Sequence, residues 1–538
     1  MSGLKANQIA RLERLYRRRV PTDKVISVEL AKTCTELSHE IRRQIGLIIN
    51  RRGNIESVIV GTDRQLVIPL LARSRSGPKL LRGVRFVHTH LHNQPLTKED
   101  LTDLALLRLD LMAAVGIGDK GEPVDISIAH LIPSKQGGQP FEELKPYPFF
   151  SFQLDCGAFV QEIENEILRS GSNLRLVGNG PGAIVVSVCT GSPADQEYRL
   201  EETKELAVSQ GIHVFDTVLQ RLPQINPKYV LGIGKIREVI IQALQMGADM
   251  LVFDRDLTPA QVRAISEITE MKVLDRTQLI LDIFAKRAHT RAGKIQVELA
   301  QLRYILPRLS QSGTALSRLG GGIGGRGPGE TKLETDHRRV RNRISHLERE
   351  LMALSHHRGQ QRSKRTRHAV PVVSIVGYTN AGKSTLLNGL THGQVSTQDR
   401  PFETLDTVSR RLHLRTGDEV ILTDTVGFIR DLPNDLLKAF RTTLDELHDA
   451  DFLLHVVDIS AQDFNQQITA VDKILRELKL EDVPQIMVLN KCDRVSPEEA
   501  EALCRRRNAI GISANSPQTL GPLRTAIAGS ISQKMSFA

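Results

Sequence analysis

Apolar runs alternate with amphipathic stretches along most of the chain, and this pattern predicts a mixed α/β fold. Short apolar runs such as 372–376 and 420–422 are typical of buried strands. In the middle of the chain a strand at 213–219, a helix at 236–246 and a strand at 250–253 follow one another. Alternation of this kind predicts a parallel sheet with helices packed on it.

Two long helices are predicted by apolar residues that recur at spacings of three and four, which places them on one face of each helix. The first stripe consists of Ile295, Leu299, Leu302, Leu306 and Leu309. The second stripe consists of Val340, Ile344, Leu347, Leu351 and Leu354. Two such stripes bury each other when the helices pack together. We therefore predict an antiparallel helical hairpin.

The first part of the chain has its own alternation of helix and strand. We predict a helix over 27–45, strands at 45–50, 58–60 and 84–87, and a helix over 98–112. Thr97 precedes the last of these helices and is a good N-cap residue. These elements form a separate α/β module.

The fold class is thus multidomain α/β. In the last domain a G-x-x-x-x-G-K-[ST] sequence after the apolar run at 372–376 predicts a P-loop, and this domain is preceded by an α/β domain, a helical hairpin and a further N-terminal α/β domain. The predicted segments are 1–155 (N-terminal extension), 156–194 (connector), 195–290 (α/β domain), 291–367 (basic hairpin) and 368–538 (nucleotide-binding domain).

The positive charge of the chain is concentrated in one region. The net charge is +10, and residues 281–370 contain 19 Lys and Arg against 7 Asp and Glu. A solvated helix face is one reading of this excess, but its localisation favours binding to a polyanion. Since aromatic residues are only 4% of the chain and Trp is absent, phosphate contacts are favoured over base stacking.

Cysteine usage and hydropathy indicate a cytoplasmic protein. The five cysteines are scattered without C-x-x-C spacing, which argues against a disulfide framework or a cysteine zinc site. No apolar run is long enough to span a membrane, and the first residues lack the apolar region of a signal peptide.

A complete G-x-x-x-x-G-K-[ST] motif follows the apolar run at 372–376. In this setting backbone N–H groups wrap phosphates, Lys383 reaches the β- and γ-phosphates, and Ser384 holds Mg²⁺. The predicted phosphate-binding residues are Gly377, Tyr378, Thr379, Asn380, Ala381, Gly382, Lys383, Ser384 and Thr385. A glycine turn between a strand and a helix is the alternative reading of the motif alone.

Four further elements follow in order and favour a nucleotide site. Thr404 in the loop is a second candidate hydroxyl ligand of Mg²⁺, and Asp424 ends a strand near the metal, which it would contact through water. Asp493 can accept hydrogen bonds from both N1–H and N2–H₂ of guanine, so the base should be guanine. The residues of these elements are Phe402, Glu403, Thr404, Leu405 and Asp406; Asp424, Thr425, Val426 and Gly427; Asn490, Lys491 and Asp493; and Ser513, Ala514 and Asn515.

This series of motifs resembles the GTP-binding domain of translation-factor-class GTPases over residues 368–538. Many of those proteins have a water-orienting glutamine at the position of Phe428. An apolar side chain cannot orient water, so we expect slow intrinsic hydrolysis and activation by a partner. Asn380 resembles the asparagine that helps hold K⁺ in potassium-stimulated GTPases, and a capping asparagine is the alternative.

The loop between the two apolar stripes is rich in glycine and arginine. Its backbone can approach RNA closely, and its basic side chains can contact phosphates. A flexible linker is the alternative reading. The candidate RNA-binding residues are Arg318, Arg326, Lys332, Arg338 and Arg339.

The stretch from Arg326 to Asp336, together with Asp275 to Phe284, resembles the HflX family of ribosome-associated GTPases over residues 195–538. The resemblance implies binding to the large (50S) ribosomal subunit and its rRNA, splitting of stalled or idle 70S ribosomes, and GTP hydrolysis, with ATP hydrolysis attributed to some members. Two residues depart from the family pattern. Asn515 stands at a position that contacts the base, and His337 interrupts the usual D-R-R sequence.

In the N-terminal module, His88, His90 and Asp100 resemble the zinc ligands of JAMM/MPN-type hydrolases. The catalytic glutamate of those enzymes has no equivalent at the matching position, where Arg42 and Arg43 stand and Glu40 lies too early. A degenerate fold of this kind is therefore favoured over an active hydrolase.

From the motifs we expect a monomeric GTPase that uses Mg²⁺ and potentially K⁺ and alternates between GTP and GDP, and the resemblance to the HflX family implies that it dissociates 70S ribosomes. One alternative is a large-subunit assembly factor that binds RNA without splitting 70S particles. A second alternative is metal-dependent hydrolase activity in the N-terminal module.

Overall fold

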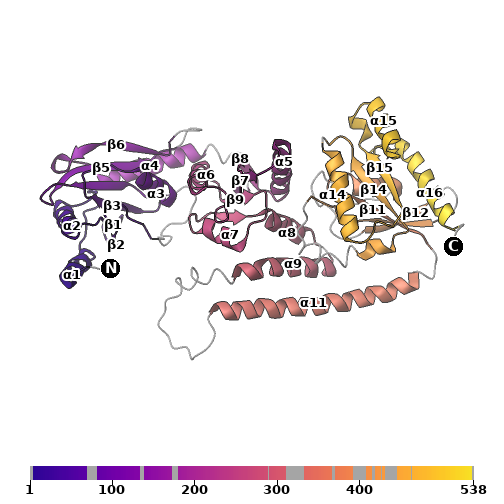
Figure 1. Ribbon diagram of the computed structural model, residues 1–538, viewed down its shortest axis with the longest axis horizontal. Coiled ribbons are helices and arrows are strands. Elements are labelled where there is room, and N and C mark those ends of the chain that lie inside the picture. The colour runs from indigo at the N-terminus through magenta and orange to yellow at the C-terminus, as the bar shows by residue number, and fades with distance from the viewer. Residues whose placement is uncertain are drawn as a thin grey trace. The chain divides into compact units, whose positions relative to one another are not determined.

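Figure 1 shows the helices and strands of the computed structural model. The chain divides into two compact units. The first comprises 1–200, 211–254 and 264–274, and the second comprises 201–210, 255–263 and 275–538. The described residues are 4–69, 81–133, 139–172, 180–288, 290–309, 332–365, 370–391, 408–414, 419–425, 427–430, 445–461 and 463–535.

The first unit begins with a six-stranded sheet in the order β2-β1-β3-β4-β5-β6. Strands β3 and β4 are parallel and the other neighbours are antiparallel. The elements are α1 (Ala6–Leu15), α2 (Val28–Ile41), β1 (Ile45–Asn50), β2 (Ile55–Val60), β3 (Val84–His90), α3 (Lys98–Leu107), β4 (Met112–Ile117), β5 (Pro123–Leu131), β6 (Phe141–Pro148) and the 3₁₀ turn η1 (Phe149–Ser151).

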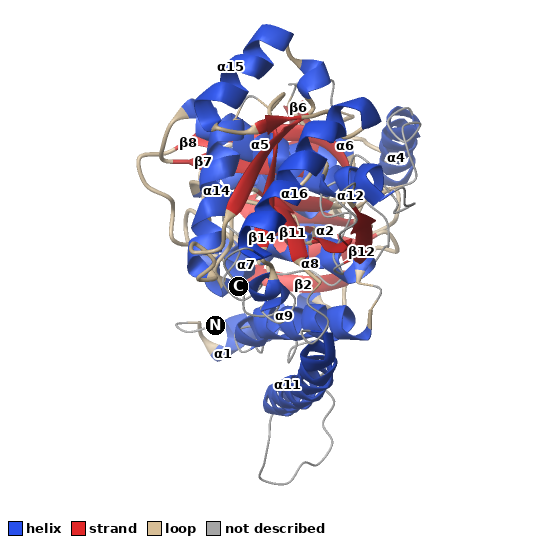
Figure 2. Cartoon of the chain, turned by 90° about the vertical axis from the view of Figure 1, so that its right-hand side faces the viewer, coloured by secondary structure: helices blue, strands red, loops and turns tan. Residues whose placement is uncertain are grey.

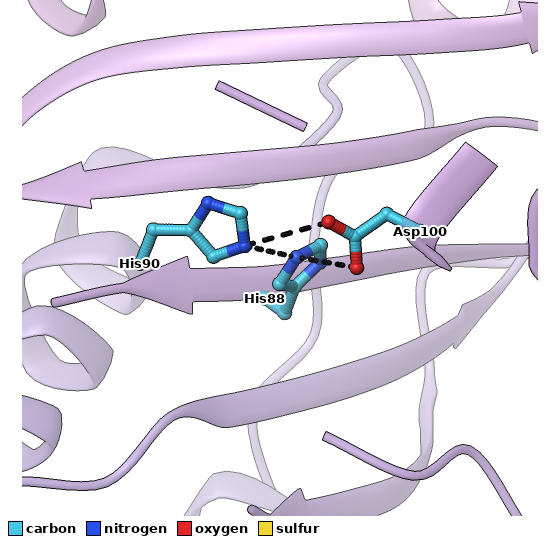
Figure 3. Close-up of side chains that lie close together, drawn as sticks. All are labelled: His88, His90 and Asp100. Carbon is cyan, nitrogen blue, oxygen red and sulfur yellow. Dashed lines mark hydrogen bonds and ion pairs between the residues drawn. The ribbon is translucent and has the colours of Figure 1, made fainter. Parts of the chain in front are cut away.

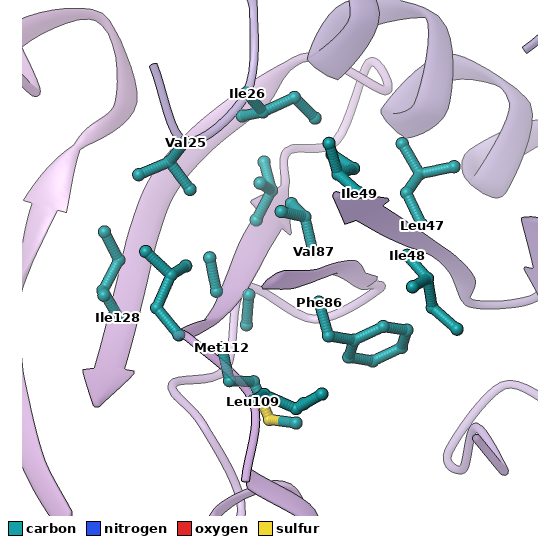
Figure 4. Close-up of a cluster of buried hydrophobic side chains, with 14 of the residues drawn as sticks. Val25, Ile26, Leu47, Ile48, Ile49, Phe86, Val87, Leu109, Met112 and Ile128 are labelled. Carbon is teal, nitrogen blue, oxygen red and sulfur yellow. The ribbon is translucent and has the colours of Figure 1, made fainter. Parts of the chain in front are cut away.

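The core of this sheet is built around its central strands (Figure 4). Leu47, Ile48 and Ile49 of β1 are buried on both faces of the strand, as are Phe86 and Val87 of β3. Every residue of β3 is buried, although the strand also carries polar side chains. Burying polar side chains costs free energy unless they form hydrogen bonds or ion pairs, so the polar side chains of β3 are expected to have such partners.

The helix predicted over 98–112 is shorter than the pattern indicated. It ends at Leu107 because Arg108 adopts a left-handed conformation with φ of 51° and closes the helix as its C-cap. Leu109 and Leu111, which continue the apolar pattern, lie in the connection to strand β4, and Met112 is the first residue of that strand. Thr97 is the N-cap as predicted, since its side chain accepts from the Asp100 N–H.

The second sheet of this unit has four parallel strands in the order β10-β9-β7-β8, as the alternation predicted. Its central strand β7 lies in the segment that we expected to be a connector, which also contains helix α4. The elements here are α4 (Cys156–Ser172), β7 (Gly182–Cys189), α5 (Pro193–Ser209), β8 (His213–Arg221), α6 (Ile233–Met246), β9 (Met250–Phe253), α7 (Pro259–Ser266) and β10 (Lys272–Leu274).

In the second unit, α8 (Arg276–Arg287) precedes two long helices, α9 (Arg291–Leu309) and α11 (Lys332–Arg365), which pack against each other. Their contact is made by the predicted apolar stripes, with Ile295, Leu299 and Leu347 fully buried at its centre. Ion pairs such as Arg343 with Glu298, at 2.7 Å, flank the apolar contact. The glycine-rich loop between the helices lies outside the described residues.

The second unit ends in a six-stranded sheet ordered β12-β13-β11-β14-β15-β16, in which only the β12–β13 pair is antiparallel. Helices and strands alternate along this part of the chain; Figure 2 colours the two kinds of element differently. Its elements are β11 (Val372–Gly377), α12 (Lys383–Thr391), β12 (Val408–His413), β13 (Glu419–Asp424), η4 (Asp445–Asp449), β14 (Phe452–Asp458), α14 (Phe464–Glu477), β15 (Gln485–Asn490), η5 (Cys492–Arg494), α15 (Pro497–Arg507), β16 (Ile510–Gly511), η6 (Pro517–Leu520) and α16 (Gly521–Met535).

None of the helices in the described ranges is both long and apolar enough to cross a membrane.

Leu347→Ala should destabilise the packing of α9 on α11 by about 2 to 5 kcal/mol, because it removes a side chain that is only 1% exposed. Hydrogen exchange of the α9 and α11 amides measures the loss as faster exchange. The matched control is Met352→Ala on the same helix, where the side chain is 70% exposed and the change should stay within about 0.5 kcal/mol. Equal exchange in both variants would contradict the packing described.

Candidate functional site

The predicted phosphate loop connects β11 to α12, and its glycines are required by close backbone contacts. A β carbon at Gly377 would lie 2.2 Å from the carbonyl oxygen of Val456, and one at Gly382 would lie 2.3 Å from the side-chain nitrogen of Asn490. Gly382 also has a φ of 90°, which favours glycine. Helix α12 begins at Lys383, so its positive end faces the loop.

Lys383 is buried at this loop, with 5% of its surface exposed. Its ammonium group donates to the carbonyl oxygen of Tyr378 at 2.7 Å. Burial lowers the pKa of Lys383 to about 8, while the charge of Asp424 acts in the opposite direction. Burial, followed by the charge of Lys383, lowers the pKa of nearby His455 to about 4, so this imidazole is neutral at pH 7.

Asp424 ends strand β13, which pairs in parallel with β11 so that Asp424 lies beside Ile375. This register brings its carboxylate to the start of α12, where the Ser384 hydroxyl donates to it at 2.7 Å. Both side chains are buried. A hydroxyl and a carboxylate oxygen at one point are the hard ligands that Mg²⁺ prefers, so this pair fits the predicted metal site.

The segment after Asp424 packs directly on the phosphate loop. A β carbon at Gly427 would lie 2.9 Å from Cγ2 of Thr379 and 3.0 Å from Nζ of Lys383, so glycine lets the two segments meet. The backbone of Phe428 accepts from the Thr379 N–H at 2.7 Å. The Phe428 side chain is 2% exposed, so it is part of the core and does not line a solvent-accessible site.

On the side predicted to hold the base, Asn490 connects three segments. Its amide donates to the carbonyl oxygen of Ala381 at 2.8 Å and accepts from the Ala514 N–H at 2.9 Å. The neighbouring Lys491 forms an ion pair with Asp458 at 2.7 Å. A hydrogen bond with Ser513 lowers the pKa of Asp493, which keeps its carboxylate ionised. This side of the site is therefore organised around one buried amide.

The structure thus brings most of the predicted nucleotide-site residues to one edge of the sheet, at the carboxyl ends of β11, β13 and β15. Asn380 is exposed in the loop with a φ of 64°, a conformation that asparagine tolerates. Several predicted residues lie outside the described ranges, namely Phe402, Glu403, Thr404, Leu405, Asp406 and Val426, together with Arg318 and Arg326 of the basic loop.

Sequence reasoning missed a polar network around Tyr378, whose hydroxyl donates to Glu202 and accepts from the Arg430 N–H at 2.8 Å. Arg276 pairs with Glu202 at 2.5 Å and also donates to the Arg430 carbonyl oxygen at 2.7 Å. All four residues belong to the second unit. The network joins the phosphate loop to the segment after Gly427. Contacts between residues so far apart in the chain cannot be predicted from the local pattern of a single sequence.

A second cluster lies in the first unit, where His88 and His90 of β3 face Asp100 at the start of α3 (Figure 3). Burial lowers the pKa of His90, and the neighbouring His88 adds to this effect. Burial acts to raise the pKa of Asp100, but hydrogen bonds and charge from His88 and Thr97 outweigh it and lower that pKa. The three residues that the sequence grouped are therefore adjacent.

Glu40 is not part of this cluster. Its carboxylate accepts from Gln8 at 2.9 Å and from Arg11 at 2.6 Å, and its side chain is 40% exposed. The left-handed Arg42 ends α2 immediately after it. The structure therefore does not bring this carboxylate to the two histidines.

Comparisons with family models agree with the order of these elements. Residues 197–285 match the GTP-binding GTPase N-terminal region, residues 287–365 match the GTP-binding GTPase middle region, and residues 372–491 match a model described as 50S ribosome-binding GTPase. Fold and site together define a P-loop GTPase.

Relatives narrow the class to one family. The chain is 48% identical over 334 residues to the GTPase HflX of Caldanaerobacter subterraneus, covering 61% of this chain and 78% of that protein. It is 41% identical over 361 residues to the GTPase HflX of Escherichia coli, covering 66% and 84%. The chain belongs to the HflX family of GTPases, and its enzymatic activity is GTP hydrolysis.

Among solved structures, a GTP-binding protein from the archaeon Sulfolobus solfataricus in complex with GDP is 24% identical, with a TM-score of 0.37, and the match covers 66% of this chain and 99% of that chain.

Proposed function

We propose that this GTPase binds the large ribosomal subunit and, in its GTP-bound state, dissociates 70S ribosomes. The observation that carries the proposal is the match of residues 372–491 to a family of 50S ribosome-binding GTPases. The concentration of basic residues directly before this region supports it, since ribosomal RNA is a polyanion. A ribosomal partner also agrees with the cytoplasmic location that the sequence predicts.

The phosphates of GTP would occupy the loop from Gly377 to Ser384. Lys383 is buried with its ammonium directed at the loop, so phosphate oxygens would compensate the burial of its charge. Mg²⁺, when bound, would neutralise phosphate charge through ligands that include Ser384 and, by way of water, Asp424, with Thr404 as a further ligand in the GTP state. The exposed position of Asn380 is compatible with a K⁺ beside the phosphates.

Guanine would be recognised by the ionised carboxylate of Asp493 and by backbone at Ser513 to Asn515. Asn490 holds these segments against the phosphate loop through its two hydrogen bonds. Base and phosphate recognition are therefore coupled by a buried side chain, which fixes the distance between the two halves of the site.

Contact with rRNA would come from the basic helical pair. Arg338 and Arg339 are exposed on α11, as is Arg341 one turn further along. Their charges can meet phosphates without disturbing the apolar stripe, which faces α9. Arg318 and Arg326 of the loop, and Lys332 at the start of α11, would extend this contact. Such binding should weaken steeply as salt concentration rises.

Hydrolysis would be slow without the partner. The Phe428 side chain is buried in the core and has no polar group with which to orient an attacking water. Ribosomal contact would supply or order the missing group. GTP hydrolysis then ends the bound state by releasing the loops that the γ-phosphate holds.

Asp493→Asn tests the assignment of the base. The variant loses the carboxylate that accepts two hydrogen bonds from guanine, so affinity for GDP should fall by at least about 100-fold. Xanthosine diphosphate should become the preferred ligand, because an amide can donate to the xanthine O2 and accept from N1–H. Isothermal titration with both nucleotides measures the change. Asp482→Asn, at an exposed carboxylate in the same region, is the matched control and should bind GDP normally.

Turnover of GTP tests activation by the partner. We expect purified large subunits to raise the rate of GTP hydrolysis by at least about tenfold, while small subunits leave it unchanged. Phosphate release under multiple-turnover conditions is the measurement. A rate that is the same with and without large subunits would contradict the proposal, whereas the GTPase activity itself would stand.

A further inference from the structure

We propose that His88, His90 and Asp100 form a binding site for a zinc-type divalent metal ion in the first unit, separate from the nucleotide site. The ion would be held by Nε2 of both histidines and by Oδ1 of Asp100. None of its residues belongs to the second unit, which contains the nucleotide site, so the proposal can be tested without relying on GTP hydrolysis or on the proposed ribosomal function.

The distances within the cluster are those of metal ligands. The two Nε2 atoms lie 2.9 Å apart, Nε2 of His88 lies 3.4 Å from Asp100 Oδ1, and Nε2 of His90 lies 3.6 Å from Asp100 Oδ2. Ligands of a tetrahedral zinc ion at about 2.0 to 2.1 Å are about 3.3 Å from each other. One ion therefore fits among these atoms with small adjustments of the side chains.

The surrounding contacts orient the ligands. Nδ1 of His90 lies 2.8 Å from the carbonyl oxygen of Gln94, which can only accept, so the ring proton is on Nδ1 and the lone pair of Nε2 faces the cluster. Oδ2 of Asp100 accepts from the N–H and the hydroxyl of Thr97 at 2.8 and 2.7 Å. Oδ1 is thereby turned toward the histidines.

The electrostatics of the cluster favour a cation. Both histidines are buried, at 1% and 4% exposed, beside an acidic side chain that is 20% exposed. With the His90 proton on Nδ1, a neutral pair has one Nε2 proton, that of His88, for two facing acceptors, Nε2 of His90 and Oδ1 of Asp100. A single Nε2–H···Nε2 hydrogen bond would leave the carboxylate facing the His90 lone pair. A metal ion would bind the lone pairs of all three ligand atoms, with the His88 proton then on Nδ1.

The residues of this site are better suited to a structural metal ion than to a catalytic one. Three protein ligands leave a position for water, but Glu40, the carboxylate nearest in the sequence pattern, is paired with Arg11 and Gln8. In the described part of the chain, the cluster comprises only the two histidines and one aspartate. The ion would tie the first turn of α3 to strand β3.

Zinc content of the full chain is the test. After chelator treatment and dialysis, titration with Zn²⁺ alone should give about one tightly bound ion per chain, measured by atomic spectroscopy. Co²⁺ in place of Zn²⁺ should give the intense visible absorption of a four- or five-coordinate site. The double variant His88→Gln/His90→Gln should lose at least about 100-fold in zinc affinity.

His92→Gln is the matched control, because His92 is exposed and lies only two residues beyond the cluster. It should bind zinc as the unaltered chain does. GTP hydrolysis by the double variant should be unchanged, which shows that the second unit is still folded. The proposal is overturned if the unaltered chain binds no zinc above the level of the double variant, or if Co²⁺ gives only the weak absorption of an octahedral aqua ion. The cluster is then a hydrogen-bonded histidine pair without metal.

Discussion

The buried ammonium group of Lys383 is the constraint around which the second unit is built. Taking this charge out of water lowers its pKa to about 8, and within the protein it is met by the Tyr378 carbonyl and by the charge of Asp424. Such an arrangement is costly in the free protein and becomes favourable when phosphate oxygens arrive. The glycines of the loop, the start of α12 and the Ser384–Asp424 hydrogen bond all lie beside the Lys383 ammonium, where the phosphates of the nucleotide would bind.

Parallel strand pairing explains how distant segments reach this charge. Strands β13 and β14 flank β11, so Asp424 and the neutral His455 come beside the phosphate loop, and β15 delivers Asn490 to the same edge. Asn490 then fixes the base-recognition segments to the loop. The polar network of Tyr378, Glu202, Arg276 and Arg430 links the loop to Glu202 and Arg276, which lie far before the first strand of the GTPase sheet in sequence.

The sequence was sufficient to predict elements that are defined by a local pattern of residues. The phosphate loop was predictable from its motif, in which Gly377 and Gly382 occupy positions without room for a side chain. The helical pair was predictable because apolar residues repeat at helical spacing, such as Ile295 and Leu299 on one helix and Ile344 and Leu347 on the other. The end of α3 was not predictable, since Arg108 closes it with a left-handed conformation that arginine rarely adopts. Glu202 and Arg276 are ordinary charged residues in helical sequence, and only the tertiary structure joins them to the site. The segment 156–194 was taken for a connector with a strand-like run at 183–188, because a single apolar run does not show which strands it pairs with.

Sedimentation of purified 70S ribosomes with this protein, in the presence of GTP, a non-hydrolysable GTP analogue, GDP or no nucleotide, shows whether the protein splits ribosomes. We expect the analogue to yield free subunits with the protein on the large one, and GDP to leave the 70S particles intact. If 70S particles stay intact with the analogue while the protein still binds free large subunits, the splitting function is contradicted and a role in large-subunit assembly takes its place.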